Sequence, residues 1–384
     1  MGVLVTLALR IDPFLNPDSH AFESLARALL NGQGFKYREP MLPGLDLFAF
    51  RAPAYPVFVA LGLALGGVGT VIALQGALNG LSAALVGAIA GHLGGVRAAW
   101  IAFALRMVWP AAWFQSGLLL SELLYECLAV LATWLVVECI HRRRLSWSVL
   151  AGVTTAAAFF TRPVALVLAF ALGLWLLLRY RRAAVAFALT VLIAWVPWPI
   201  RNAQRLHAFV PTVTNGGALA WCGTAGGEVH PAWEWMAKHL ELGEVGLDRH
   251  FYDLAYERMR RDPARAVLRS IRWATVYLGP IQGRGGDLWV HRFAMLAALP
   301  ALLLGAWRRR LALPALIWGG HGALLVPITI IERYRFPTEW CAVIAAALGL
   351  VGFAERFGTR RAVVAAGLAL ALCIVGGLLT LAPH

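Results

Sequence analysis

Residues 118–161 read LLLSELLYECLAVLATWLVVECIHRRRLSWSVLAGVTTAAAFFT. An apolar run over residues 118–140 is followed by the basic loop HRRR at 141–144 and by a second apolar run at 147–161. An apolar run of about 20 residues is long enough to cross the hydrocarbon core of a membrane as a helix. Short loops rich in arginine mark the cytoplasmic side. This stretch therefore predicts two transmembrane helices joined by a short cytoplasmic loop.

The same pattern continues along the chain, whose 384 residues are 60% hydrophobic and only 14% charged. Three further arginine-rich loops lie at 179–182, 308–310 and 356–361. When all four basic loops are placed inside, the apolar runs alternate in direction without conflict; they cover residues 70–92, 97–114, 118–140, 147–161, 163–178, 183–199, 291–307, 311–331, 337–354 and 362–382. We therefore expect an all-α, polytopic transmembrane helical bundle of about 10–12 spans that forms one domain over residues 1–384.

The net charge and the cysteines exclude several other classes of protein. A formal charge of +14 would favour nucleic acid in a soluble chain, but the orientation rule already accounts for the arginine loops. We therefore expect no nucleic-acid partner. Four of the five cysteines lie in apolar runs and only Cys222 lies in a long polar stretch, so neither a disulfide framework nor a metal-binding cysteine pair is predicted.

Two polar regions, residues 10–69 and 200–290, fall outside the membrane in this topology. Within the first, the short apolar run 53–65 is expected to be an interfacial helix. Residues 3–9 are too short to span, and we expect them to be the end of a first helix that begins upstream, since the chain start lacks the basic residues of a signal peptide. In the second region, residues 247–261 and 264–278 predict amphipathic helices that are broken at Asp262-Pro263.

The outer face collects an acid and several arginines. Its polar residues are Asp18, Arg51, Glu122, Arg162, Arg201, Asn202, Glu332, Arg333 and Arg335. A carboxylate can take a proton from an acceptor, and cations can stabilise the charge that develops on a departing phosphate. The set therefore favours an enzyme that displaces a phosphate at the outer membrane surface.

Six motifs in fixed order carry a family resemblance. They are NPDSHAFESLARALLNGQGF (16–35), RAPAYPVF (51–58), LLLSE (118–122), TRP (161–163), PWPIRN (197–202) and ERYRFP (332–337). Together they resemble the GT-C superfamily of integral-membrane glycosyltransferases, and most closely the branch of the protein O-mannosyltransferases and the lipid A aminoarabinose transferase. The resemblance implies transfer of a sugar from a polyprenyl-phosphate donor to a lipid, glycan or protein acceptor at the non-cytoplasmic face. Lys36 and Lys238 are the only lysines, and this arginine bias is typical of a GC-rich bacterial genome, so we expect a bacterial plasma membrane and a periplasmic active site.

The resemblance also implies roles for individual residues. The family's loop acid corresponds to Asp18, the catalytic base, and its basic residue corresponds to Arg51, which would bind the donor phosphate. Arg162 and Arg335 are expected to help bind that phosphate, and the first and second polar regions to be catalytic and substrate-facing. Supporting roles are expected for Glu122, Arg201, Asn202, Glu332 and Arg333. A single displacement by the acceptor would invert the anomeric carbon.

Two departures from the family pattern concern metal binding. Ser19 stands where the family usually has a second acid, and Phe50 stands where the aminoarabinose branch has an acid before the basic residue. No cofactor is therefore predicted, and a divalent metal stays an open alternative.

Several of these residues also have structural interpretations. Asp18 could be the N-cap of a helix over residues 19–30, and Glu122 an interhelical hydrogen-bond partner. Arg162 and Arg335 could extend to lipid headgroups. Arg106 lies in mid-span and needs a partner, for which Glu126 has the matching depth.

Two other functions share parts of this pattern. A transporter or flippase of lipid-linked sugars would place polar groups near the midplane and often shows paired repeats, neither of which is evident. A lipid-linked oligosaccharide ligase or polymerase uses the same donor chemistry, and this alternative stays open.

Overall fold

The structure is a computed structural model, and it describes residues 11–39, 41–225, 230–278, 287–303, 309–327 and 332–381. The expected N-terminal helix end at residues 3–9 lies outside them. The first half of the chain contains α2 (Pro17–Leu30), β1 (Tyr37–Arg38), β2 (Asp46–Leu47), α3 (Ala54–Gly66), α4 (Val68–Met107), α5 (Pro110–Gly117), α6 (Glu122–Arg142), α7 (Leu145–Thr161), α8 (Ala165–Arg179), α9 (Arg181–Trp195) and α10 (Pro197–Leu206). The second half contains α11 (Gly216–Ala225), α12 (His230–Lys238), η1 (Leu240–Leu242), α13 (Gly243–Arg261), α14 (Pro263–Leu278), α15 (Asp287–Leu303), α17 (Ala312–Leu325), α18 (Glu332–Arg335), η2 (Phe336–Thr338), α19 (Glu339–Phe357) and α20 (Thr359–Leu381).

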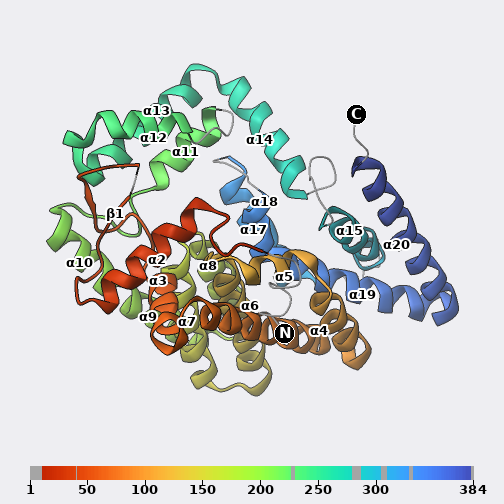
Figure 1. Cartoon of the computed structure of the whole chain (residues 1–384). Helices are drawn as coiled ribbons and strands as arrows, with labels where there is room; N and C mark the ends of the chain where they lie inside the picture. Colours follow the sequence, from red (N-terminus) through yellow and green to blue (C-terminus); the bar gives the residue numbers. More distant parts are fainter. Residues whose placement is uncertain are drawn as a thin grey trace.

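The molecule is a helical bundle, as predicted, and each of the ten apolar runs contributes a helix (Figure 1). Four described stretches are long and apolar enough to cross a membrane: Val68–Met107, Glu122–Arg142, Arg181–Leu206 and Arg333–Phe357. Shorter apolar helices, such as α7 and α8, accompany them. The run at 53–65 forms α3; its interfacial position stays a prediction.

The long helix α4 is a hairpin of two antiparallel segments. Gly95 breaks it with φ +80°, a backbone conformation that side chains other than glycine rarely adopt. Close packing of the two segments depends on glycine as well, since a Cβ at Gly87 would lie 3.0 Å from the carbonyl oxygen of Ala99. The hairpin therefore supplies the two predicted spans at 70–92 and 97–114.

The second of these spans is shorter than predicted. The helix ends at Met107, and Trp109 is extended (φ −72°, ψ 110°) before the separate helix α5 begins at Pro110. The residue before a proline is disfavoured in the helical region, which explains the break. The expected continuous helix to residue 114 is therefore wrong.

Three of the four basic loops meet at one end of the bundle. Arg143 donates to the carbonyl oxygen of Arg179 at 3.1 Å, which joins the first two loops. Arg310 donates to the carbonyl oxygen of Leu93 at 3.0 Å, and the neighbouring His92 lies 5.4 Å from His141 between ring centroids. These contacts agree with the prediction that the basic loops share one side.

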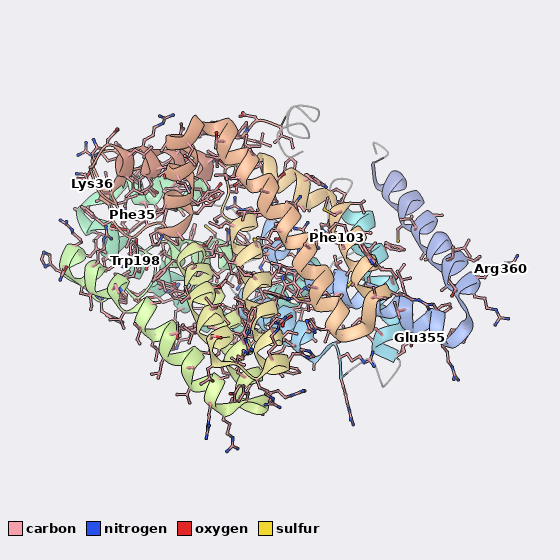
Figure 2. All side chains as sticks on the ribbon, turned by 90° about the horizontal axis from the view of Figure 1, so that it is seen from below. Phe35, Lys36, Phe103, Trp198, Glu355 and Arg360 are labelled. Atoms are coloured by element: carbon pink, nitrogen blue, oxygen red, sulfur yellow. The ribbon has the colours of Figure 1, made fainter. Side chains whose placement is uncertain are left out.

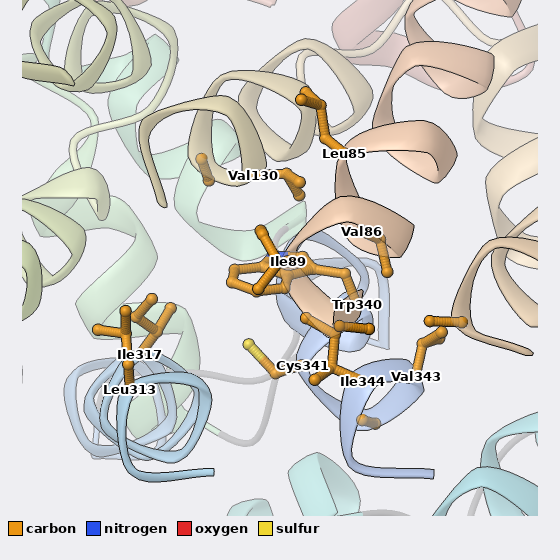
Figure 3. Close-up of a cluster of buried hydrophobic side chains, with 14 of the residues drawn as sticks. Leu85, Val86, Ile89, Val130, Leu313, Ile317, Trp340, Cys341, Val343 and Ile344 are labelled. Carbon is orange, nitrogen blue, oxygen red and sulfur yellow. The ribbon is translucent and has the colours of Figure 1, made fainter. Parts of the chain in front are cut away.

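The core of the bundle lies between α4, α6, α17 and α19. Figure 3 shows Ile89 of α4 beside the indole of Trp340, which is fully buried, and Val130 of α6 in the same cluster. Ile317 of α17 and Cys341 of α19 belong to the same cluster. Because lipid tails are as apolar as these side chains, close van der Waals packing, and not removal of apolar surface from water, stabilises the contacts among the membrane-spanning helices.

A polar layer covers the end of the bundle opposite the basic loops. It consists of α2, the β1–β2 hairpin and α10–α14, and Figure 1 shows α11–α14 grouped at that end. The hairpin, in which Tyr37 pairs with Leu47, was not predicted. The break between α13 and α14 at Asp262 confirms the predicted one. Phe35 and Trp198 pack edge to face at 5.4 Å, on the opposite side of the molecule from Glu355 and Arg360 (Figure 2).

Candidate active site

Asp18 lies in the first turn of α2. The helix begins at Pro17, a favourable first residue, and its N-cap is Asn16, whose Oδ1 accepts from the backbone N–H of Asp18 at 3.0 Å. Asp18 is therefore not the N-cap, and the structural interpretation of this residue is wrong. Because Asn16 makes the capping bond, the Asp18 carboxylate can bind groups outside the helix. The positive end of the helix dipole favours its negative charge.

Two arginines from distant segments hold the Asp18 carboxylate. Arg51, just before α3, donates to Oδ1 at 2.7 Å, and Arg333 of α18 donates to Oδ2 at 2.5 Å. The guanidinium of Arg51 also lies over the rings of Phe22 and Phe50, at 5.5 and 5.4 Å from their centroids. Phe50 thus contacts Arg51 through its aromatic face.

A second carboxylate extends this arrangement. Glu122, the first residue of α6, is buried, and its Oε1 lies 2.8 Å from Nη1 of Arg162 and 3.5 Å from Nε of Arg333. Arg162 follows α7 and also donates to the Ser121 hydroxyl at 3.0 Å. Arg51, Asp18, Arg333, Glu122 and Arg162 thus form a row of alternating charges, which we call the ion-pair row. With three arginines and two carboxylates, its net charge is +1.

Some buried polar atoms of the ion-pair row lack hydrogen-bond partners. Within the described ranges these include Nε of Arg51, Nη1 of Arg333 and Oε2 of Glu122. A buried donor without a partner is costly, and such groups are rare in folded proteins unless a ligand or water satisfies them. The arginine donors therefore have unused capacity for an anion.

The charges set the protonation state of Asp18. Burial alone would raise the pKa of its carboxyl group, but the positive charges of Arg51 and Arg333 outweigh burial and hold the pKa well below its usual range. Burial by itself would lower the pKa of the Arg51 guanidinium. Asp18 and then Tyr37 outweigh burial, so the pKa of Arg51 lies above its ordinary value. Asp18 is accordingly ionised and Arg51 protonated.

The other predicted site residues lie elsewhere. Arg335 is buried beside Glu339, to which its Nε donates at 2.8 Å, so Arg333 and not Arg335 contacts Asp18. Arg201 donates to the carbonyl oxygens of Phe48 and Phe35 at 2.6 and 2.7 Å, and therefore holds the first polar region to α10. Asn202 is buried and donates to the carbonyl oxygen of Val210 at 3.0 Å. The Glu332 side chain lies outside the described residues.

Sequence reasoning missed Glu244, which fixes the segment leading to Arg51. Its carboxylate accepts from the backbone N–H groups of Phe48 and Ala49 at 2.7 and 2.8 Å and from the Thr214 hydroxyl at 2.5 Å. The backbone N–H of Thr214 in turn donates to the carbonyl oxygen of Ala49 at 3.0 Å. We call this set the Glu244 clamp. No motif marks it, since Glu244 follows its partner Phe48 by 196 residues.

Glu39, a further acid near the ion-pair row, was also not predicted from the sequence. Glu39 accepts from the Tyr37 hydroxyl at 3.3 Å, and burial raises the pKa of its carboxyl group although Arg51 opposes this. Glu39 precedes Pro40 and belongs to none of the six motifs. It is a third carboxylate, besides Asp18 and Glu122, that an acceptor group at Arg51 could contact.

The predicted partnership of Arg106 and Glu126 is confirmed. Arg106 donates to both carboxylate oxygens of Glu126, at 3.0 and 2.6 Å, and both side chains are buried. Asn79 of α4 accepts a third hydrogen bond from Arg106 at 2.7 Å. This ion pair is a structural element of the bundle.

No protein-family model matches the sequence, and no curated protein matches it. Among solved structures, the oligosaccharyltransferase of Archaeoglobus fulgidus in complex with Zn and sulfate is similar to this chain, with a TM-score of 0.61 and 16% identity over 98% of this chain and 52% of that one. AglB of the same organism, in complex with an inhibitory peptide and a dolichol-phosphate, gives a TM-score of 0.58 and 14% identity over 98% of this chain and 53% of that one. ArnT from Cupriavidus metallidurans bound to undecaprenyl phosphate gives a TM-score of 0.45 and 14% identity over 92% and 76% of the two chains.

The two archaeal likenesses show the fold. The chain has the fold of the archaeal oligosaccharyltransferase, which agrees with the fold that the six ordered motifs implied. The chain spans about half the length of the archaeal oligosaccharyltransferase that it matches.

The residues around Asp18 do not fit a divalent metal ion. Both oxygens of Asp18 are engaged by arginines, and Glu122 is paired with Arg162. The residue beside Asp18 is Ser19, and the described part of the chain contains no group of three or more His, Cys, Asp or Glu side chains that could hold a metal. The donor set is that of an anion site.

Proposed function

We propose that this protein is a glycosyltransferase that transfers a sugar from a polyprenyl-phosphate donor to a lipid, glycan or protein acceptor at the non-cytoplasmic face of a bacterial plasma membrane. The observation that carries the proposal is the ion-pair row, in which Asp18 is held between Arg51 and Arg333. The GT-C fold supports it, because the similar archaeal enzyme AglB was solved with a dolichol-phosphate.

The arginines of the ion-pair row would bind the donor phosphate. Arg51 and Arg333 carry buried N–H groups without partners among the described residues, and phosphate oxygens are the acceptors that a guanidinium binds best. As the bond between sugar and phosphate breaks, negative charge grows on the leaving phosphate. Cations already in place stabilise that charge in the transition state. Arg162, at the other end of the row, would hold Glu122.

Asp18 would act as the base once the donor is bound. In the structure, two arginines keep its pKa low, and a carboxylate in that state accepts a proton poorly. When a phosphate draws Arg51 and Arg333 toward itself, Asp18 loses part of this stabilisation and its pKa rises. The carboxylate then takes the proton of the acceptor hydroxyl or amine as that group attacks the anomeric carbon, and the configuration is inverted.

The proposed function is tested by the lipids that cells accumulate. A deletion strain is complemented with the wild-type gene, with Asp18→Asn, or with the control Asp12→Asn, which changes an exposed acid whose carboxylate accepts from the N–H of Phe14. Extracted lipids are measured by mass spectrometry. A polyprenyl-phosphate sugar should accumulate in the deletion and Asp18→Asn strains and be consumed in the other two, since loss of a general base slows transfer about 100- to 10,000-fold.

The companion variant Glu39→Gln separates the two candidate bases. If Glu39→Gln accumulates the donor while Asp18→Asn does not, the base is Glu39. If no polyprenyl-phosphate sugar accumulates in the deletion strain, the proposed donor is wrong. Accumulation of a lipid-linked oligosaccharide in its place would favour the ligase or polymerase, and loss of surface glycan without any accumulating substrate in the outer leaflet would favour a flippase.

A further inference from the structure

A second cluster of arginines lines an open cavity in the polar layer, between α11, α13 and α14. The cavity has a volume of about 770 Å³. Its lining includes Trp221 and five arginines, namely Arg258, Arg261, Arg265, Arg269 and Arg272. It shares no residue with the ion-pair row, and we call it the arginine cavity.

Only some of these arginines have acidic partners. Arg261 pairs with Glu257 at 2.9 Å, and Arg265 pairs with Asp262 at 3.4 Å. No carboxylate in the described ranges pairs with the other three arginines. Five arginines and two acids leave the lining with a net charge of +3.

Two of the three remaining arginines are positioned by contacts that leave their charge uncompensated. Arg269 donates to the carbonyl oxygen of Thr224 at 2.6 Å, and Arg258 lies over the Trp221 ring at 5.7 Å. Burial, and then the like charges of Arg258 and Arg265, lower the pKa of Arg269. An anion in the cavity would relieve this repulsion, whereas a cation or an apolar ligand would not.

The helix α14 carries a second, apolar surface. Arg265, Arg269 and Arg272 recur at intervals of four and three residues and so lie along one face. Val267 and Ile271, which lie on another face of the helix, are 60% and 56% exposed. A helix with arginines on one face and exposed aliphatic residues beside them is typical of a helix that lies in the membrane interface, with its cations at the level of the lipid phosphates.

We propose that the arginine cavity binds the phosphate-bearing headgroup of an anionic membrane lipid through Arg258, Arg269 and Arg272. The aliphatic residues of α14 enter the boundary between headgroups and acyl chains, and the headgroup enters the cavity beside Trp221. The site goes beyond the proposed sugar transfer and does not depend on it.

The test measures lipid binding by the purified full chain in detergent. The probes are dihexanoyl phosphatidylglycerol, dihexanoyl phosphatidylcholine and inorganic phosphate, titrated by calorimetry. The cavity variant carries Arg258→Gln, Arg269→Gln and Arg272→Gln. The control variant carries Arg205→Gln, Arg249→Gln and Arg260→Gln, three exposed arginines of the same polar layer that do not line the cavity, so that both variants lose the same charge.

The cavity variant should bind phosphatidylglycerol about 100-fold more weakly than the wild type, since each basic residue near an anionic headgroup contributes about fivefold. The control variant should change by less than about threefold, and the wild type should prefer phosphatidylglycerol to phosphatidylcholine. Equal weakening in both variants, or no preference between the two lipids, would overturn the proposal. Inorganic phosphate that binds as tightly as phosphatidylglycerol would also overturn it, by showing a site for free phosphate. Thermal melting of each variant verifies that it is folded, and single substitutions replace the triple variant if it is not.

Discussion

The ion pair of Arg51 with Asp18 and its contacts with two aromatic rings orient the guanidinium for the phosphate role that we propose. Its guanidinium contacts one oxygen of Asp18 and the faces of two phenylalanines, so it is oriented before any donor arrives. A preorganised cation is most effective against charge that develops only in the transition state. Arg51 should therefore matter more for turnover than for substrate binding.

Arg51→Ala should lower kcat more than it raises the KM for acceptor, and Arg51→Lys should recover part of the activity, because lysine keeps the charge but not the bidentate fork. The measurement is steady-state transfer from a polyprenyl-phosphate donor. Arg38→Ala is a matched control, since Arg38 is 67% exposed and pairs with Asp46. Wild-type kinetics in both Arg51 variants would move the phosphate role to Arg333, which contacts the other oxygen of Asp18.

Arg106 and Glu126 should be energetically coupled. Removing either side chain strands a buried charge, which destabilises a protein by about 3–5 kcal/mol, whereas removing both should cost less than the sum. The cycle Arg106→Met, Glu126→Gln and the double variant is measured by unfolding in mixed micelles. The exposed pair Arg27 and Glu23 serves as a control, with an expected coupling of about 0.3–0.5 kcal/mol. Additive losses at Arg106 and Glu126 would show that they act independently.

At the level of elements, α13 positions the segment before Arg51 through the hydrogen bonds of Glu244. Glu244→Ala removes the Glu244 clamp and frees Phe48 and Ala49, so Arg51 should lose its position and turnover should fall about 10- to 100-fold. Glu244→Gln keeps one acceptor oxygen and should retain intermediate activity. Glu241→Ala, an exposed acid three residues earlier, is the control. A Glu244 variant with a lower melting temperature but a normal kcat in the folded state would show that the Glu244 clamp contributes to stability and does not position Arg51.

The same helix should make stability depend on pH. Burial, and then the charge of Glu244, raise the pKa of Asp248 to about 6, although its bond from the N–H of Gly217 opposes this. The folded state thus binds the proton more tightly than the unfolded state, whose pKa is about 3.9. The stability from Asp248 is therefore complete below about pH 4 and is lost as the pH rises through 6.

Asp248→Asn, which stays neutral and can still accept from Gly217, should raise the melting temperature at pH 7.5 and leave it unchanged at pH 4. Melting of the detergent-solubilised protein at both pH values measures the difference. Asp253→Asn, an exposed acid on α13, is the control. A variant as stable as the wild type at pH 7.5 would show that Asp248 is solvated and titrates normally.

At the level of the whole molecule, the topology predicts where reagents reach the chain. The five native cysteines are buried, so background labelling should be low. New cysteines at the exposed positions Arg38 and Arg261 should react with a membrane-impermeant maleimide in intact cells, whereas those at Arg143 and Arg309 should react only after the cells are opened. Labelling of position 143 from outside would show that the predicted topology is inverted. The proposed location of the active site would then be wrong as well.

The sequence could not show which arginine of the motif ERYRFP contacts Asp18. The motif ERYRFP predicted an arginine at the site, and the structure brings Arg333 to Asp18 while Arg335 turns to Glu339. Residues two apart on a helix point about 200° away from each other, so only one of the two can face the same neighbour. Which one does so depends on how α18 packs against α2 and α6, and that packing is absent from the local pattern.

The sequence by itself determined the helical class, the ten apolar runs, the shared end of the basic loops and the partnership of Arg106 with Glu126. Each follows from local rules, namely span length, the cost of a charge in the membrane and the distribution of arginine. Only the tertiary structure decided that Arg333 joins Asp18 to Glu122 and that Glu244 holds the segment before Arg51. Those contacts join segments far apart in the chain, because side-chain partners at a helix end are set by the packing of whole elements and not by spacing along the sequence.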